Sequence, residues 1–176
     1  SFKYIERLVS FSYFRKALSA QTLGVAESYI GKALKLYPND LYLRTYAQIH
    51  LLKINSLVGK GASLSDQDKN DLKISVQESV KGVELAKKYD PTNYFNFQLL
   101  GSMYQTAGLL GYEDVYDKSI EAYQTASLLN PLNPKLKLSL ATVFNALGKI
   151  KEAKDYAQAA VALKPDYVDA YITLSQ

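Results

Sequence analysis

The sequence predicts an all-α protein built from consecutive pairs of antiparallel helices. The last two prolines lie 34 residues apart, which is the period of a helix–turn–helix unit that ends in proline. Four of the five prolines close an amphipathic run in the same way, at Leu36-Tyr37-Pro38, Tyr89-Asp90-Pro91, Leu129-Asn130-Pro131 and Leu163-Lys164-Pro165. We therefore expect a short array of repeated helix pairs.

The composition is that of a soluble globular protein and excludes several kinds of site. The 176 residues are 48% hydrophobic and 22% charged, and none is cysteine. Disulfides, thiol nucleophiles and thiolate zinc sites are therefore excluded. The single histidine, His50, excludes any site that needs two imidazoles. We expect no metal site, no cofactor and no catalytic centre.

The net charge of +4 is concentrated near the N-terminus. Residues 1–37 account for all of it, and the rest of the chain is balanced. A nucleic-acid-binding protein needs an extended basic stripe, which this chain lacks. Nucleic acid is therefore not an expected partner.

Residues 1–20 predict an amphipathic first helix. Charged and polar residues separate apolar residues that recur at helical spacing. These apolar residues are Phe2, Ile5, Leu8, Val9 and Phe11. We interpret this segment as a packed first helix, with a membrane-proximal helix as the alternative. The first residue is serine rather than methionine, which favours a fragment of a longer chain.

The repeat that ends at Pro165 places small residues where two helices must approach closely. These are Ala141, Ala153 and Ala160, and Gly148 stands in the turn between the two helices. The arrangement resembles the tetratricopeptide repeat (TPR) family. Lys137 departs from it, because the family usually has a large apolar residue at that position.

The repeat before it carries the same resemblance, through Phe97, Leu100, Gly101 and Tyr104. Six extra residues fall near 109–116, between its two helices, and we expect an exposed turn there. Further upstream, the repeat from Pro38 to Pro91 has an insertion near 58–71, with a helix starting at Ser65 or Asp66.

We therefore divide the chain into the first helix, 1–20, and a TPR array, 21–176, of about four units with a truncated final helix at 168–176. The resemblance implies a right-handed superhelical α-solenoid whose first helices line a concave groove. By register, the expected lining is Arg44, Gln48, Gln98, Ser102, Gln105, Leu138, Thr142 and Asn145.

This lining is polar but contains a single cationic side chain, Arg44. TPR domains that clamp chaperone C-termini use several cations, so such a role is disfavoured. The prediction is a non-catalytic scaffold that binds a peptide or a partner protein in the groove.

The insertion from Gly111 to Lys118, which precedes Ser119-Ile120-Glu121-Ala122-Tyr123, and the long loop before Asp71 also resemble the C-terminal TPR regions of bacterial O-antigen ligase or polymerase-like membrane proteins. That resemblance implies an alternative function, the accessory domain of a membrane glycan-transferring enzyme. It also implies a bacterial source and a membrane tether on the N-terminal side of this chain.

Three groups of residues could serve either a structural role or a chemical function. Asp66, Asp68 and Asn70 alternate as in a calcium loop, but the required glycine and glutamate are missing, so we favour a helix cap. The acidic cluster Glu113, Asp114 and Asp117 has no other catalytic group beside it in the sequence, so we interpret it as a solvated turn, with a contact surface for a basic partner as the alternative. His50 falls where a packed tyrosine is usual, so we expect it to be buried or half-buried and not a ligand or base.

Overall fold

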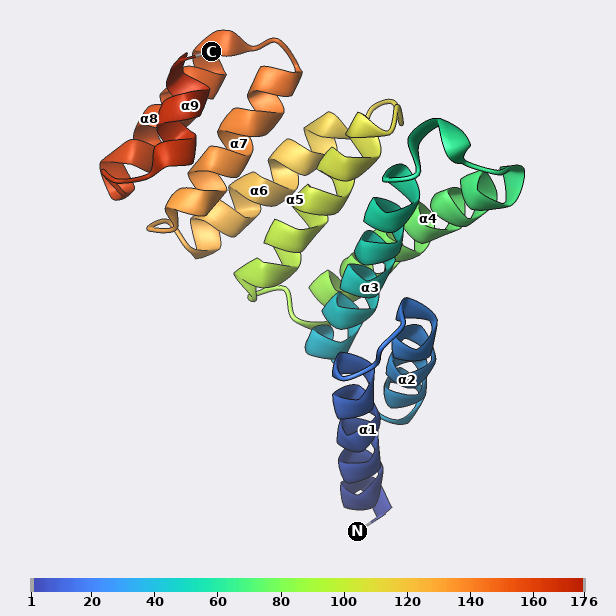
Figure 1. The fold of residues 1–176 in the computed structure, drawn as a ribbon. Coiled ribbons are helices and arrows are strands. Elements are labelled where there is room, and N and C mark those ends of the chain that lie inside the picture. The colour runs from blue at the N-terminus through green and yellow to red at the C-terminus, as the bar shows by residue number, and fades with distance from the viewer. Residues whose placement is uncertain (1, 176) are drawn as a thin grey trace. The chain divides into compact units, whose positions relative to one another are not determined.

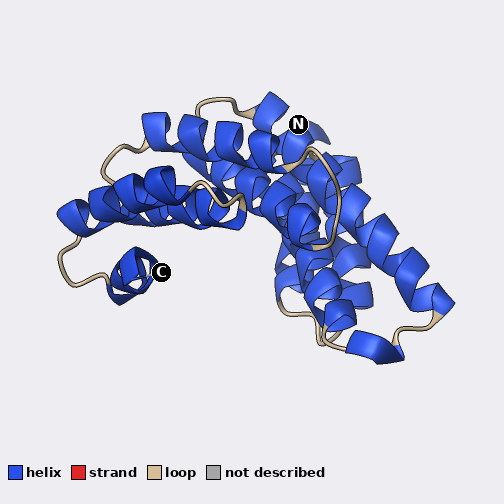
Figure 2. Cartoon of the chain, turned by 90° about the horizontal axis from the view of Figure 1, so that it is seen from above, coloured by secondary structure: helices blue, strands red, loops and turns tan. Residues whose placement is uncertain are grey.

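The computed structural model of the chain describes residues 2–175, which form helices joined by short connections, with no strand among them (Figure 2). The chain divides into two compact units, residues 1–91 and 92–176. The first contains α1 (Phe2–Leu18), α2 (Leu23–Leu36), α3 (Asp40–Val58), the 3-10 turn η1 (Gly61–Ser63) and α4 (Asp66–Tyr89). The second contains α5 (Tyr94–Leu109), α6 (Tyr116–Leu129), α7 (Pro134–Ala146), α8 (Ile150–Leu163) and α9 (Val168–Ser175) (Figure 1).

An asparagine just after a proline starts the first helix of each of three repeats. The side chains of Asn39, Asn93 and Asn133 each accept a hydrogen bond from a backbone N–H in the first turn of α3, α5 and α7. An asparagine cap of this kind stabilises a helix by about 1 kcal/mol. The proline therefore follows the end of one helix, as the repeat pattern predicts, and the asparagine begins the next.

In the first unit, α1 packs on α2, α2 on α3 and α3 on α4. The rings of Phe14 in α1 and Tyr42 in α3 stack with their centroids 4.6 Å apart. Between α1 and α2, the buried hydroxyl of Ser10 donates a hydrogen bond of 2.8 Å to the carbonyl oxygen of Ala33. Small residues at this contact allow the two helices to approach closely.

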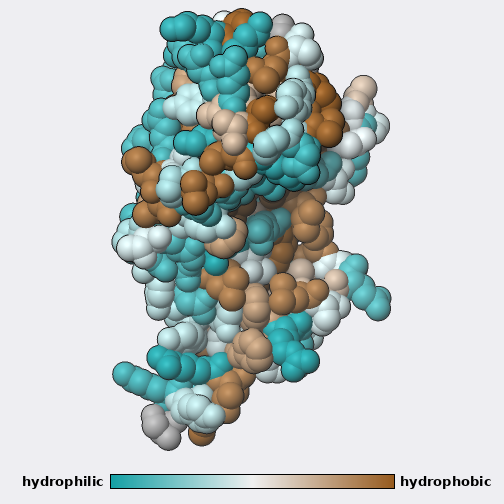
Figure 3. Space-filling view, turned by 90° about the vertical axis from the view of Figure 1, so that its left-hand side faces the viewer, coloured by the Kyte–Doolittle hydropathy of each residue, from teal (hydrophilic) through white to brown (hydrophobic). Residues whose placement is uncertain are grey.

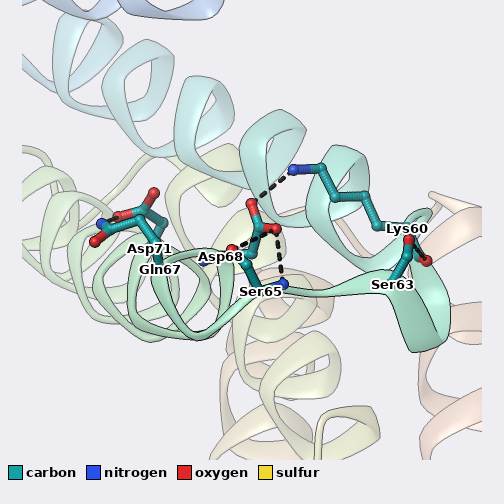
Figure 4. Close-up of polar contacts among 6 residues, drawn as sticks. All are labelled: Lys60, Ser63, Ser65, Gln67, Asp68 and Asp71. Atoms are coloured by element: carbon teal, nitrogen blue, oxygen red, sulfur yellow. Dashed lines mark hydrogen bonds and ion pairs between the residues drawn. The ribbon is translucent and has the colours of Figure 1, made fainter.

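The long connection before α4 is held by a cap (Figure 4). Ser65 caps α4, which confirms the predicted helix start, and Asp68 completes a reciprocal capping box with it. Asp68 also accepts a hydrogen bond of 2.6 Å from Lys60. Of the predicted insertion at 58–71, only residues 59–65 lie between α3 and α4. Most of the extra residues of this repeat lengthen these two helices rather than the loop.

In the second unit, α5 packs on α6 and α7 on α8, and α6 joins the two pairs by packing on α7. The predicted small residues Ala141, Ala153 and Ala160 are all buried. Gly148 has a φ of +69°, so the predicted left-handed turn between α7 and α8 is confirmed. The helices form the antiparallel pairs that the sequence predicts.

The outer face of α1 exposes large apolar side chains. Phe2, Ile5 and Leu8 are 75%, 58% and 52% exposed, whereas Phe14 and Ala17 are buried against the rest of the unit. The N-terminal end, at the bottom of Figure 3, correspondingly shows hydrophobic side chains beside hydrophilic ones. Within residues 2–175 no helix is both long and apolar enough to cross a bilayer.

Candidate functional site

Six of the eight predicted groove residues lie in the second unit, on α5 and α7. Gln98, Ser102 and Gln105 follow one another at intervals of four and three residues, which places them on one face of α5. On α7 the corresponding residues are Leu138, Thr142 and Asn145. Thr142 is exposed and the other five are partly exposed, so a ligand can reach all six side chains without unfolding of the unit.

The hydroxyl of Tyr123 joins the predicted residues on α5 to α7. Tyr123 projects from α6, is 3% exposed, and donates a hydrogen bond of 3.1 Å to Oε1 of Gln105. Burial raises the pKa of Tyr123, and hydrogen bonds with the hydroxyls of Ser139 and Ser102 oppose that shift. Because Ser139 lies on α7, polar groups of both first helices lie near this buried phenol, and Gln105 accepts its hydrogen bond.

The sequence alone does not mark the Tyr123 hydroxyl or Ser139 as part of a site, because Tyr123 falls at a packing position of the repeat. The ring is indeed buried. The polar role of its hydroxyl depends on Gln105 and Ser139, which lie 18 and 16 residues away in the chain. No periodicity in the sequence signals such a junction.

Gln98 contributes an acceptor without a protein donor. Its Oε1 atom is buried and has no hydrogen-bond partner among the described residues. Leaving such an atom unpaired costs free energy, which a donor from a ligand would recover once Gln98 turns toward it. On α7, by contrast, the Thr142 hydroxyl already donates to the carbonyl oxygen of Leu138 at 2.9 Å.

In the first unit, the predicted residues Arg44 and Gln48 both lie on α3. Gln48 is exposed. The guanidinium of Arg44 pairs with the carboxylate of Asp40 one turn earlier. The single predicted cation is thus neutralised locally, which weakens any attraction of this helix for an acidic ligand.

A second polar cluster, in the first unit, surrounds His50. Its Nε2 lies 3.2 Å from Oε1 of Glu27 without hydrogen-bond geometry, and Glu27 also pairs with Lys53. His50 is 2% exposed, as predicted, and burial lowers its pKa more than the Glu27 carboxylate raises it. The imidazole is therefore neutral at pH 7. A pocket of about 360 Å³ adjoins the cluster, with Leu23 and Ile74 among its lining residues.

Tyr46 and Glu78 extend this cluster toward α4. The Tyr46 hydroxyl donates a hydrogen bond of 2.6 Å to Oε2 of Glu78. This bond lowers the pKa of Glu78. The same bond adds to burial in raising the pKa of Tyr46. Together these contacts link Glu27 of α2, His50 and Tyr46 of α3, and Glu78 of α4, so the cluster fastens the three helices to one another.

Of the two acidic segments that the sequence singled out, the one at the start of α4 forms a helix cap and the one around the start of α6 is exposed to solvent. Hydrogen bonds from Lys60 and Ser65 lower the pKa of Asp68 to about 2. Glu113, Asp114 and Asp117 are exposed, as the solvated-turn interpretation predicts. Across residues 2–175, no group of three or more His, Asp or Glu side chains is arranged to hold a metal ion.

Comparison with known proteins identifies the fold. No protein-family model matches the chain, and no curated protein resembles it in sequence. The crystal structure of MamA matches over 94% of this chain and 78% of its own, with a TM-score of 0.71 and 18% identity. The first TPR of Spaghetti (RPAP3), bound to the HSP90 peptide SRMEEVD, matches over 75% of this chain and 90% of its own, with a TM-score of 0.53 and 18% identity.

The TPR domain of Arabidopsis OM64 is also similar, over 76% of this chain and 94% of its own, with a TM-score of 0.52 and 15% identity. At identities this low, structural similarity indicates a shared fold and not a shared ligand. Together with the capped helix pairs and the buried small residues, these similarities establish that the chain has the all-α TPR solenoid fold.

Proposed function

We propose that this chain is a non-catalytic interaction scaffold that binds an extended peptide or a segment of a partner protein along α5 and α7. The observation that carries the proposal is the hydrogen bond by which the buried Tyr123 hydroxyl orients Gln105 of α5, with Ser102 of α5 and Ser139 of α7 close enough to influence the same phenol. Side chains held in this way lose little conformational entropy when a ligand binds. Arg44 and Gln48 on α3 are proposed to provide a similar contact surface in the first unit.

The chemistry of this surface favours a neutral extended backbone over an acidic tail. The six predicted residues on α5 and α7 are amides, hydroxyls and one leucine, and none is cationic. Amides and hydroxyls offer both donors and acceptors, which match the alternating groups of a peptide backbone. Gln98 adds an acceptor that lacks a protein partner. The RPAP3 domain was solved with an acidic peptide, and we expect a different class of ligand here.

A peptide-display selection against the whole chain tests the proposal. Selected peptides should lose affinity at least ten-fold for Thr142→Arg, which places a long side chain on the exposed face of α7. Thr125→Arg is the matched control, because Thr125 on α6 makes the same 2.9 Å bond to the carbonyl four residues before it. Peptides that bind wild type and Thr142→Arg equally, or a failure to select any peptide, would contradict the proposal.

We also propose a second role, as the accessory domain of a bacterial membrane-bound glycan-transferring enzyme. The observation that favours it is the outer face of α1, where exposed Phe2, Ile5 and Leu8 lie among Lys3 and Arg7. Apolar and basic side chains together suit the surface of an anionic bilayer. An antibody to this chain should then detect a membrane-bound protein much larger than 19.6 kDa, and a soluble band of 19.6 kDa would contradict this role.

A further inference from the structure

Lys137 occupies a position at which the other repeats place an apolar side chain. It is the fourth residue after the capping Asn133, and the fourth residues after Asn39 and Asn93 are Leu43 and Phe97. Leu43 is buried, and Phe97 packs against the core of the second unit. Lys137 is likewise only partly exposed. A charge therefore stands where the fold ordinarily packs a hydrophobic group.

The ammonium group of Lys137 has a hydroxyl partner but no counter-ion. Its Nζ donates a hydrogen bond of 2.7 Å to Oγ of Ser127, a residue of α6 that is 6% exposed. Among residues 2–175 no carboxylate pairs with it. A partly buried charge that lacks a partner of opposite sign is unfavourable, and a bound anion would relieve that cost.

A pocket of about 400 Å³ opens beside this ammonium group. Its walls come from α6, α7 and α8 and combine apolar with polar side chains, including Leu128, Leu140, Gln124 and Tyr156. This volume is within the range of small-ligand sites in proteins. The pocket thus places one cation and several hydrogen-bonding groups next to apolar surface.

We propose that this pocket binds a carboxylate carried on a small apolar group. The carboxylate would accept hydrogen bonds from Lys137 and from the Ser127 hydroxyl, while the apolar group would contact Leu128 and Leu140. One cation matches the single charge of a carboxylate, whereas a phosphate would leave a second charge uncompensated. Such a ligand is either the C-terminus of a peptide ending in an apolar residue or a free organic acid.

The site differs from the surface proposed above for an extended peptide. That surface is formed by polar residues of α5 and α7, whereas this pocket is lined by α6, α7 and α8. Loss of one function is therefore expected to leave the other intact. The Thr142→Arg variant should retain the carboxylate site.

The test is a titration of isotopically labelled protein with N-acetyl-leucine and with N-acetyl-leucinamide, followed by NMR at constant ionic strength. The acid should shift the signals of Leu128, Leu140 and Tyr156, and the uncharged amide should bind at least ten-fold more weakly. Lys137→Met removes the charge but keeps the length of the side chain, and should weaken binding of the acid at least ten-fold. Lys135→Met is the matched control, because Lys135 is an exposed lysine of the same helix and does not line the pocket.

Folding is checked by the urea midpoint of each variant, and Lys137→Met should be at least as stable as wild type. The proposal is overturned if the acid causes no shifts at millimolar concentration, if acid and amide bind alike, or if Lys137→Met binds as wild type does. A tetrapeptide ending in leucine then separates the two ligand sources. Tighter binding than N-acetyl-leucine identifies a peptide C-terminus, and equal or weaker binding identifies a free acid.

Discussion

Replacing Gly101 by alanine should destabilise the second unit through one specific contact. Gly101 lies in α5 with its Cα facing the ring of Tyr123. A Cβ added there would lie 2.8 Å from Cγ and Cδ1 of that ring. Carbon atoms pack at about 3.5 to 4.0 Å, so either the ring or the helix must move. The ring is 3% exposed and its hydroxyl is fixed by Gln105, which leaves it little room.

Two opposing effects set how much Gly101→Ala changes the free energy of unfolding. Overpacking of a core costs about 1–3 kcal/mol. Alanine in place of glycine in a helix interior contributes about 1 kcal/mol in the opposite direction. The Tyr123 ring is buried and its hydroxyl is hydrogen-bonded, so it cannot easily move away. We therefore expect an overpacking cost near the upper end of that range. The net loss should be about 1–2 kcal/mol in the free energy of unfolding.

Gly31→Ala provides the control, since an added Cβ at Gly31 in α2 would meet nothing within 4 Å. That variant should be more stable than wild type by about 1 kcal/mol. Both variants are measured by urea unfolding followed by circular dichroism, with hydrogen exchange of the α5 amides to locate the effect. If Gly101→Ala is as stable as wild type while Gly31→Ala gains stability, the proposed packing of Tyr123 on Gly101 is wrong.

Three further predictions concern polar groups. Burial lowers the pKa of His50 from its ordinary value of 6.5, so the folded protein binds this proton less readily than the unfolded chain. The free energy of unfolding, measured by urea titration, should therefore fall from about pH 7 to about pH 5.5. His50→Phe should remove that fall. Ser65→Ala removes the cap of α4 and should cost about 1 kcal/mol, with faster hydrogen exchange at the Asp68 amide; unchanged exchange would refute the cap. Tyr123→Phe should cost about 1 kcal/mol in urea and shift the NMR signal of the Gln105 side-chain amide, and an unmoved signal would exclude the bond.

Much of this fold is predictable from local chemistry. Pro38, Pro91 and Pro131 follow the ends of helices, which a proline cannot continue because it has no N–H to donate, and the asparagine after each of them caps the next helix. Buried alanines mark close helix contacts, as at Ala141 and Ala160. The burial of His50 was also predictable, because the repeat register assigns that position to a packed side chain. These signals all lie within one period of the repeat.

The features that were not predictable depend on contacts between periods. Glu27 reaches His50 across 23 residues, and no spacing rule connects them. The junction at Tyr123 depends equally on Gln105 and Ser139 of neighbouring helices. Lys137 was visible as a departure from the repeat, but its pocket becomes evident only when α6, α7 and α8 are packed together.

The most direct test of the scaffold function is to place a photocrosslinking amino acid at Thr142 in the native protein and irradiate the source cells. The matched position is Lys154, which is exposed on α8. Thr142 should give one discrete adduct that a display-selected peptide competes away, and Lys154 should not. An adduct formed equally from both positions, or from Lys154 alone, would contradict the claim that α5 and α7 form the binding surface.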